Sequence, residues 1–109
     1  MARGGGFGNM QQLMQQAQRM QAEMEKKKEQ LEQQTVTASS GGGMVTVTAN
    51  GAQKVLAITI DPAAVDPDDV EMLEDLVLAA VSSALEQAQA MIDKEMGAMM
   101  GGLNLPGMP

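Results

Sequence analysis

The sequence of 109 residues contains no cysteine, histidine, tryptophan or tyrosine, and Phe7 is its only aromatic residue. Without cysteine the chain can form neither a disulfide framework nor a thiolate metal site. Histidine is the usual general base and a common metal ligand, so its absence argues against an enzyme. One aromatic side chain cannot build a stacking platform for single-stranded nucleic acid. We therefore expect no catalytic residues, no metal, no cofactor and no small-molecule substrate.

Long apolar runs are also missing. The first residues lead into glycines rather than into the apolar core of a secretory signal. The most apolar stretch, residues 76–85, is interrupted by Ser82 and Ser83 and is far too short to span a bilayer. We expect a soluble, cytoplasmic protein that has no membrane partner.

The charge is unevenly distributed along the chain. The net charge is −7, which by itself disfavours nucleic acid as a partner. Residues 1–59, however, hold six basic and four acidic side chains, whereas residues 60–109 hold one basic and ten acidic side chains. The net charge alone therefore does not show whether nucleic acid is a partner. The basic residues of the first half are Arg3, Arg19, Lys26, Lys27, Lys28 and Lys54.

A long helix is predicted over residues 9–34, with Asn9 as its cap, because apolar residues recur there every 3.5 positions. At 1.5 Å per residue this helix is roughly 39 Å long. The radius of gyration of a compact domain of this size is only about 13 Å. The apolar stripe therefore needs a second helix or a second subunit to cover it. The predicted seam consists of Met10, Leu13, Ala17, Met20, Met24 and Leu31.

Three strands should follow the first helix, because the apolar period changes to two over residues 35–39, 44–49 and 54–60. The first two are separated by three glycines, and Asn50-Gly51 predicts a tight hairpin, since both residues tolerate positive φ. In the second strand, Val45, Val47 and Ala49 share one face, which we expect to be buried. In the third strand, alternation places Leu56, Ile58 and Ile60 on one face. The pattern predicts a three-stranded antiparallel sheet.

A second long helix is expected from Asp66, as the cap, to about Gly97. Pro67 suits the first helical position, and the acidic residues after it favour the positive end of the helix dipole. This helix would be about 45 Å long, so both helices would extend beyond strands of some 20 Å. We predict an α+β protein with the order α-β-β-β-α and, since overhanging apolar stripes require a partner, a homodimer with projecting helical arms. The expected divisions are a flexible lead-in at 1–8, a single domain at 9–97 and a disordered tail at 98–109.

Two interpretations of the lysine triplet at 26–28 remain open. Helical geometry spreads its members around the surface, and glutamates at helical spacing can pair with them, which describes a solvated and self-compensated face. Alternatively, the triplet contacts phosphates. The twelve methionines likewise fit either flexible filling of apolar seams or an adaptable binding surface.

Several stretches resemble the YbaB/EbfC family of small bacterial nucleoid-associated proteins. They cover nearly the whole chain. They are GGFGNM at 5–10, QAQRMQ at 16–21, GGMVTVTANG at 42–51, ITIDP at 58–62, EMLEDLV at 71–77 and the tail at 103–109.

The resemblance implies an α-β-β-β-α fold in an intertwined, tweezers-like homodimer. It also implies cytoplasmic binding of double-stranded DNA on the nucleoid, with little sequence preference, altered DNA conformation and a part in nucleoid organisation and gene regulation. Arg19 stands at the family's Gln-Arg/Lys-Met position, and the lysine triplet lies further along the same arm. Ser82 stands where members often carry Asn, and residues 85–90 lack the basic residue that others have. The second helix should therefore contribute little phosphate contact.

A protein-interaction adaptor is the alternative function. In that case the methionine-rich and acidic surfaces would bind another protein, and DNA binding would be weak or absent.

Overall fold

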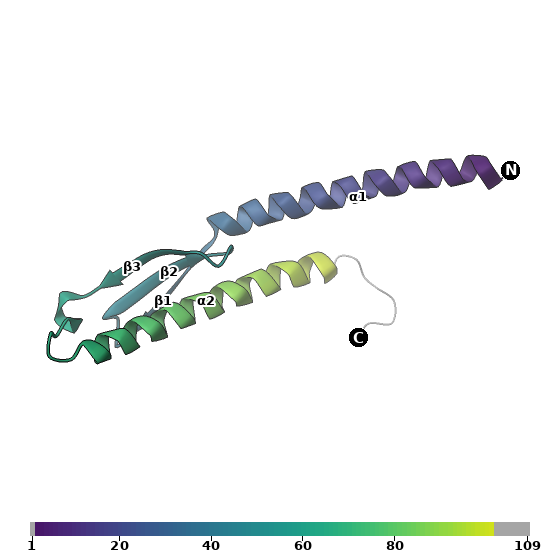
Figure 1. Cartoon of the computed structure of the whole chain (residues 1–109). Coiled ribbons are helices and arrows are strands. Elements are labelled where there is room, and N and C mark those ends of the chain that lie inside the picture. The colour runs from purple at the N-terminus through teal and green to yellow at the C-terminus, as the bar shows by residue number, and fades with distance from the viewer. Residues whose placement is uncertain (1, 102–109) are drawn as a thin grey trace. The chain divides into compact units, whose positions relative to one another are not determined.

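The computed structural model describes the backbone of residues 2–101 and the side chains of residues 9–99. The element order is α1 (Ala2–Gln33), β1 (Thr35–Ser40), β2 (Val45–Asn50), β3 (Val55–Ile60), a short 3-10 helix (Pro62–Ala64) and α2 (Val70–Gly101) (Figure 1). The predicted order of helix, three strands and helix is therefore confirmed. The chain forms two compact units, residues 1–30 and residues 31–109.

The sheet of the second unit is antiparallel, with the strand order β1-β2-β3. Figure 1 shows α2 running along this sheet, and its contacts fall chiefly on β1 and β2. Val45, Val47 and Ala49 of β2 are fully buried, as their alternation predicts. Between β1 and α2 the hydroxyl of Ser40 donates a 2.6 Å hydrogen bond to the carbonyl oxygen of Leu76. The core of this unit thus lies between α2 and the central strand.

Small side chains dominate this core. Ala80, Ala84 and Ala88, spaced by four residues on α2, are all completely buried. Positions four apart lie one above the other on a helix, so these alanines form a smooth ridge. A ridge without bulk lets α2 approach the sheet closely.

The boundaries of α1 differ from the prediction. The helix begins at Ala2, so Asn9 lies inside it and does not cap it. Glycine within a helix costs up to about 1 kcal/mol relative to alanine, which weakens the first turns without forbidding them. The predicted boundary between a flexible lead-in at 1–8 and the domain at 9–97 stays a prediction, because the described side chains begin only at residue 9.

The hairpin predicted at Asn50-Gly51 does connect β2 to β3, but neither of these two residues has positive φ. Asn50 ends β2, the turn continues to Gln53, and the non-glycine residue with positive φ in this turn is Gln53, at 58°. The register also shifts between Thr48 and Ala49, so that Val55 pairs with Ala49. The side chains of β3 therefore alternate regularly between the two faces of the sheet only after this irregularity. The three glycines after β1, Gly41 to Gly43, do have positive φ and form the other turn.

The start of α2 also differs from the prediction. The helix begins at Val70 rather than at Asp66, and the backbone N–H of Met72 donates to Oδ1 of Asp69 at 3.2 Å. Asp66 instead accepts a hydrogen bond from the N–H of Asp68 at 2.9 Å within a separate turn. Asp69 is therefore the cap. At the other end α2 continues through Gly97 to Gly101, four residues past the predicted stop, and the tail at 102–109 lies outside the described residues.

Candidate nucleic-acid interface

The first unit presents almost its whole surface to solvent, because it is a single helix. From Asn9 to Gln30 every side chain is exposed except Lys27, which is partly buried. Arg19, Lys26 and Lys28 are thus accessible to a ligand. The side chain of Arg3, also predicted to bind DNA, lies outside the described side chains.

Arg19 and Lys26 share one face of α1. Seven residues correspond to nearly two helical turns, so their side chains lie about 20° apart around the axis and about 10.5 Å apart along it. Lys27 and Lys28 project at successive rotations of about 100° from Lys26. The predicted triplet is therefore divided, and the pair that the helix brings onto one face is Arg19 with Lys26.

Glutamines surround Arg19, and they were not among the predicted DNA-binding residues. Two shallow depressions on α1 have Arg19 in common, and their other lining residues are Gln12, Gln15, Gln16, Gln18 and Ala22. Side-chain amides contact phosphate and sugar oxygens in many protein–DNA complexes. The dense glutamine spacing before Arg19 was the sequence signal for this surface.

Acidic neighbours on α1 do not prevent its basic residues from binding phosphate. Glu23 lies four residues after Arg19, and Glu29 lies three residues after Lys26, so both can pair at helical spacing. Both glutamates are exposed. Exposed helical pairs of this kind stabilise by only about 0.3–0.5 kcal/mol. A phosphate can therefore displace such a glutamate at little cost.

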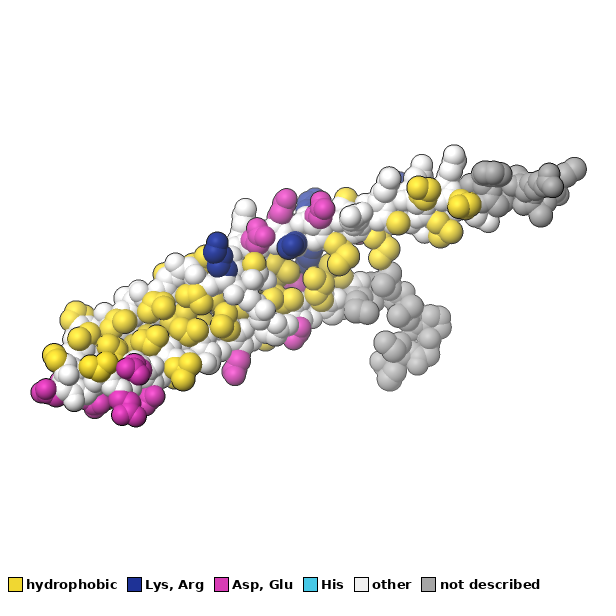
Figure 2. Space-filling model, in the orientation of Figure 1, with side chains coloured by type: hydrophobic (Ala, Val, Ile, Leu, Met, Phe, Trp, Pro, Cys, Tyr) yellow, Lys and Arg dark blue, Asp and Glu magenta, His cyan; other side chains and the backbone are white. Residues whose placement is uncertain are grey.

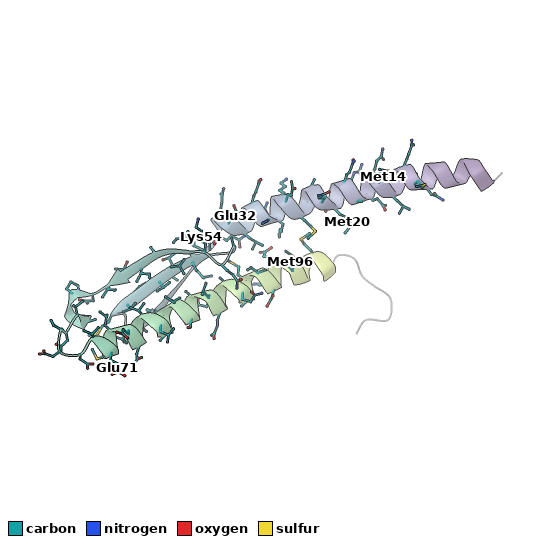
Figure 3. The ribbon with its side chains drawn as sticks, viewed as in Figure 1. Met14, Met20, Glu32, Lys54, Glu71 and Met96 are labelled. Atoms are coloured by element: carbon teal, nitrogen blue, oxygen red, sulfur yellow. The ribbon has the colours of Figure 1, made fainter. Side chains whose placement is uncertain are left out.

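Lys54 belongs to the other unit and is exposed (Figure 3). It follows the turn after β2, where its backbone N–H donates to Oδ1 of Asn50 at 3.0 Å. The amide of Asn50 also donates to the carbonyl oxygen of Glu32 at 3.1 Å, so an acidic residue borders the same turn. Lys94 is the one other basic residue in the sequence of this unit, so Lys54 is not a member of a basic cluster within it.

Acidic side chains gather at the other end of the second unit, where α2 begins (Figure 2). They come from the loop before α2 and from its first turns. Two of them, Asp66 and Asp69, accept hydrogen bonds from backbone N–H groups, which leaves their negative charge in place. This end would repel DNA. The acids are Asp61, Asp66, Asp68, Asp69, Glu71, Glu74 and Asp75.

Of the predicted seam, five residues are exposed and one is not. Met10 and Leu13 are each 63% exposed, and Met20 and Met24 are about half exposed. Ala17 is exposed as well. Leu31 is only 4% exposed and packs in the second unit, so it is not available to a partner helix. The stripe that remains open ends at Met24.

Within the part of the chain that the structure describes, there is neither a candidate membrane-spanning helix nor a candidate metal site. Neither helix between residues 2 and 101 combines the length and apolar character needed to cross a membrane. Across the same part of the chain, acidic side chains do not come together in any group of three or more that could hold a metal ion.

Comparison with known proteins identifies the family. Residues 6–103 match the YbaB/EbfC DNA-binding family. A nucleoid-associated protein of Moorella thermoacetica is 56% identical over 102 residues, which cover 94% of this chain and 98% of the relative. A nucleoid-associated protein of Desulforamulus reducens is 54% identical over 101 residues, covering 93% and 96% of the two chains. The chain belongs to the YbaB/EbfC DNA-binding family.

A solved structure supports the fold alone. The crystal structure of the uncharacterized protein HP0035 from Helicobacter pylori superposes with a TM-score of 0.64 at 23% identity, covering 76% of this chain and 96% of that one.

Proposed function

We propose that this protein binds double-stranded DNA on the bacterial nucleoid as a homodimer with little sequence preference. In doing so it alters the conformation of the DNA and contributes to nucleoid organisation and gene regulation in the cytoplasm. The observation that carries the proposal is the match of residues 6–103 to a DNA-binding family, together with relatives named nucleoid-associated proteins. These findings favour DNA binding over the adaptor alternative.

The surface of α1 supports contact with the phosphate backbone rather than with base edges. Arg19 and Lys26 lie on one exposed face, about 10.5 Å apart along the helix, so both cations can meet the same phosphate backbone. Glutamines border Arg19 and can donate to phosphate or sugar oxygens. Contacts of this kind position a protein on a duplex without reading its sequence.

A homodimer supports this function because it doubles a small set of cations. One chain carries seven basic residues against fourteen acidic ones, so a single arm offers few contacts. Two arms on one duplex would make about four to six phosphate contacts, which corresponds to a log–log salt slope between about −3.6 and −5.4. Affinity should then fall by two to three decades between about 50 and 200 mM salt.

The test is fluorescence anisotropy with a labelled duplex over a salt series, on protein whose mass has been measured by light scattering. The double substitution Arg19→Gln and Lys26→Gln should weaken binding at least tenfold at low salt. It should also flatten the slope by about 0.9 for each phosphate that the variant no longer neutralises. The triple substitution of Lys26, Lys27 and Lys28 to Gln should remove most of the binding and leave the dimer intact.

Lys94→Gln, an exposed site on α2, is the matched control for removal of one positive charge. It should change affinity far less than Arg19→Gln alone. If binding is insensitive to salt, or if Lys94→Gln and Arg19→Gln weaken it equally, the proposed use of α1 is wrong.

A further inference from the structure

Methionine is the side chain through which an oxidant acts on this protein. The sequence has no cysteine, tryptophan or tyrosine, the other readily oxidised side chains, but it has twelve methionines. A peroxide transfers one oxygen atom to the thioether: a sulfur lone pair forms the S–O bond, the O–O bond breaks, and the released hydroxide takes up a proton to leave as water. The sulfur loses two electrons and the peroxide gains them. The product, methionine sulfoxide, is polar, and specific reductases convert it back to methionine.

The most exposed of the described methionines lie on α1. Met10 and Met14 are each 63% exposed, Met20 is 53% exposed and Met24 50%. We refer to these four residues as the α1 methionines; Figure 3 labels two of them, Met14 and Met20. Met72 on α2 is 41% exposed. The remaining methionines whose side chains are described are partly buried, and they are Met44, Met91, Met96 and Met99. A dissolved oxidant therefore reaches the sulfur atoms of α1 first.

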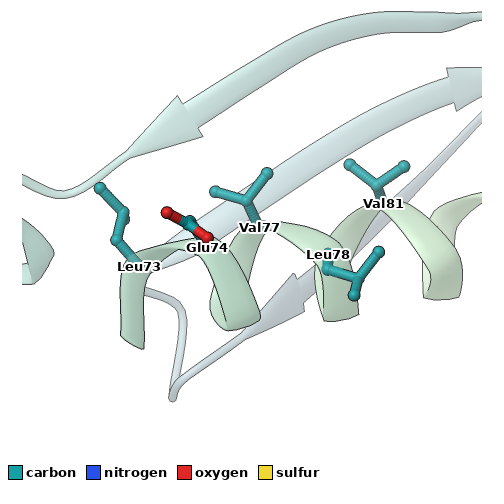
Figure 4. A pocket seen from close by; sticks show the side chains of 5 residues that line it. All are labelled: Leu73, Glu74, Val77, Leu78 and Val81. Atoms are coloured by element: carbon teal, nitrogen blue, oxygen red, sulfur yellow. The ribbon is translucent and has the colours of Figure 1, made fainter. Parts of the chain in front are cut away.

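An apolar groove on α2 offers no sulfur to an oxidant. Its volume is about 450 Å³, and its lining is aliphatic apart from one carboxylate. Peroxides oxidise neither kind of side chain. The lining residues are Leu73, Glu74, Val77, Leu78 and Val81 (Figure 4). Oxidation therefore changes the apolar stripe of α1 and leaves this apolar surface of the second unit as it is.

The segment that carries the α1 methionines depends on local interactions for its helical conformation. From Asn9 to Gln30 every side chain except Lys27 is exposed, so little tertiary packing supports it. Isolated helices are only marginally stable in water. Methionine favours a helix because its side chain is unbranched at Cβ and loses little freedom there. Apolar side chains four residues apart also contact each other and stabilise the helix. Residues 10 and 14 form one such pair, and residues 20 and 24 form another.

Oxidation removes this local support. A sulfoxide oxygen accepts hydrogen bonds from water, so the apolar contact within each pair is replaced by contact with solvent. The stripe becomes polar on both of its pairs. Because the helix is marginal without tertiary packing, the balance between helix and coil in α1 shifts toward coil.

The effect on DNA binding passes through the helix and not through direct blocking of phosphate. Each of the α1 methionines projects at least about 100° away from Arg19 around the helix axis. Arg19 and Lys26 share one face only while the seven-residue interval between them is helical. When this interval unfolds, the two cations no longer meet the phosphate backbone together.

We propose that the α1 methionines form a reversible oxidation site that weakens DNA binding when it carries sulfoxides. This inference rests on the proposed DNA binding and names one way in which that binding is regulated. A peroxide makes the stripe polar, α1 loses helix, and its cations lose their common face. Reduction of the sulfoxides restores all three properties.

The first experiment treats the full-length protein with hydrogen peroxide and follows each methionine by peptide mass mapping. The α1 methionines should be oxidised at least about threefold faster than Met44 and Met91, because oxidation follows exposure. Helix content is measured on the same samples by circular dichroism, and duplex affinity by fluorescence anisotropy at low salt. Helix content should fall, and affinity should fall by at least about threefold as phosphate contacts are lost. Treatment with the reductases for both sulfoxide epimers and a dithiol should restore both.

A leucine variant is the matched control. Leucine keeps the apolar stripe and the helix propensity but contains no sulfur. Each protein is compared with itself before and after treatment, which cancels any effect of the substitutions on basal affinity. The leucine variant should keep its affinity and helix content, although eight of the twelve methionines remain oxidisable. Met72→Leu should lose as much affinity on treatment as the natural sequence. The substitutions of the leucine variant are Met10→Leu, Met14→Leu, Met20→Leu and Met24→Leu.

The outcomes separate this inference from the proposed function. Unchanged affinity of a protein whose α1 methionines are fully oxidised would overturn the inference and leave DNA binding standing. An equal loss of affinity in the leucine variant would also overturn it, because the sensitive methionines would then lie elsewhere. If the untreated protein does not bind duplex DNA at low salt, the proposed function is wrong, and this inference falls with it.

Discussion

One amide side chain holds three segments of the second unit together. Asn50 is 6% exposed; its NH2 group donates to the carbonyl oxygen of Glu32, and its Oδ1 accepts from the N–H groups of Ala52 and Lys54 at 3.0 Å. The next residue, Gly51, donates its N–H to the carbonyl oxygen of Leu31 at 2.8 Å. The end of α1, the turn and the start of β3 are thus fixed by two adjacent residues.

Gly51→Ala should destabilise the protein by about 1–3 kcal/mol, the usual cost of overpacking. A Cβ at this position would lie 2.7 Å from Cβ of Leu31 and against its backbone carbonyl group, which cannot move without disturbing α1. Gly97→Ala is the control: nothing lies near its Cβ position, so the helix propensity of alanine should raise stability by up to about 1 kcal/mol. Urea denaturation followed by circular dichroism measures both, and equal effects would contradict this role of Gly51.

At the scale of elements, α2 is defined by its first turn and by the ridge of alanines. Its N-terminus has one capping side chain, that of Asp69, and an acidic residue in the first turn, Glu71. Both suit the positive end of the helix dipole. The preceding turn is separate and is organised by Asp66.

Asp69→Ala should lower the free energy of unfolding by about 0.5–2 kcal/mol, because the N–H of Met72 is left without its acceptor. Asp68→Ala removes the same charge from the neighbouring position, whose side chain is exposed. It should cost only a few tenths of a kcal/mol, through the helix dipole. Thermal unfolding of the two variants side by side distinguishes them, and a larger destabilisation by Asp68→Ala would mean that the cap is assigned wrongly.

Sequence periodicity predicted which helices and strands form and in which order, but not the residues at which they begin and end. The alternation of Val45, Val47 and Ala49 predicted a buried face, and that face is buried. The sequence pattern could not distinguish Asp66 from Asp69 as the cap, because both are acids at suitable spacing and the choice depends on where the chain leaves β3. Nor could it show that Leu31 belongs to the second unit, since its heptad position matches that of Met24. What separates Leu31 from Met24 is its contact with Gly51 in the folded chain, which the sequence pattern does not show.

At the scale of the whole molecule, the decisive property for DNA binding is a net charge of −7 on a protein of a DNA-binding family. The cations proposed for contact act locally, whereas the acids act over a Debye length of about 10 Å at 0.1 M salt. The acids should therefore slow association most at low ionic strength.

Neutralising three exposed acids, Glu71→Gln, Asp75→Asn and Glu86→Gln, changes the net charge from −7 to −4. Affinity for duplex DNA should rise several-fold at about 20–50 mM salt, mainly through the association rate, and the gain should fade as salt screens the field. Stopped-flow fluorescence over a salt series measures this. A gain that persists at high salt would indicate a direct contact rather than a field effect.

The alanine ridge of α2 restricts how this protein can evolve. A single base change in an alanine codon yields valine, threonine, serine, glycine, proline, aspartate or glutamate. At a completely buried position against the sheet, valine and threonine add bulk, aspartate and glutamate bury a charge, proline breaks the helix, and glycine weakens it. Only serine is nearly neutral in size. Ala80, Ala84 and Ala88 therefore leave natural variation almost no accessible alternatives, while the exposed positions between them are free to drift.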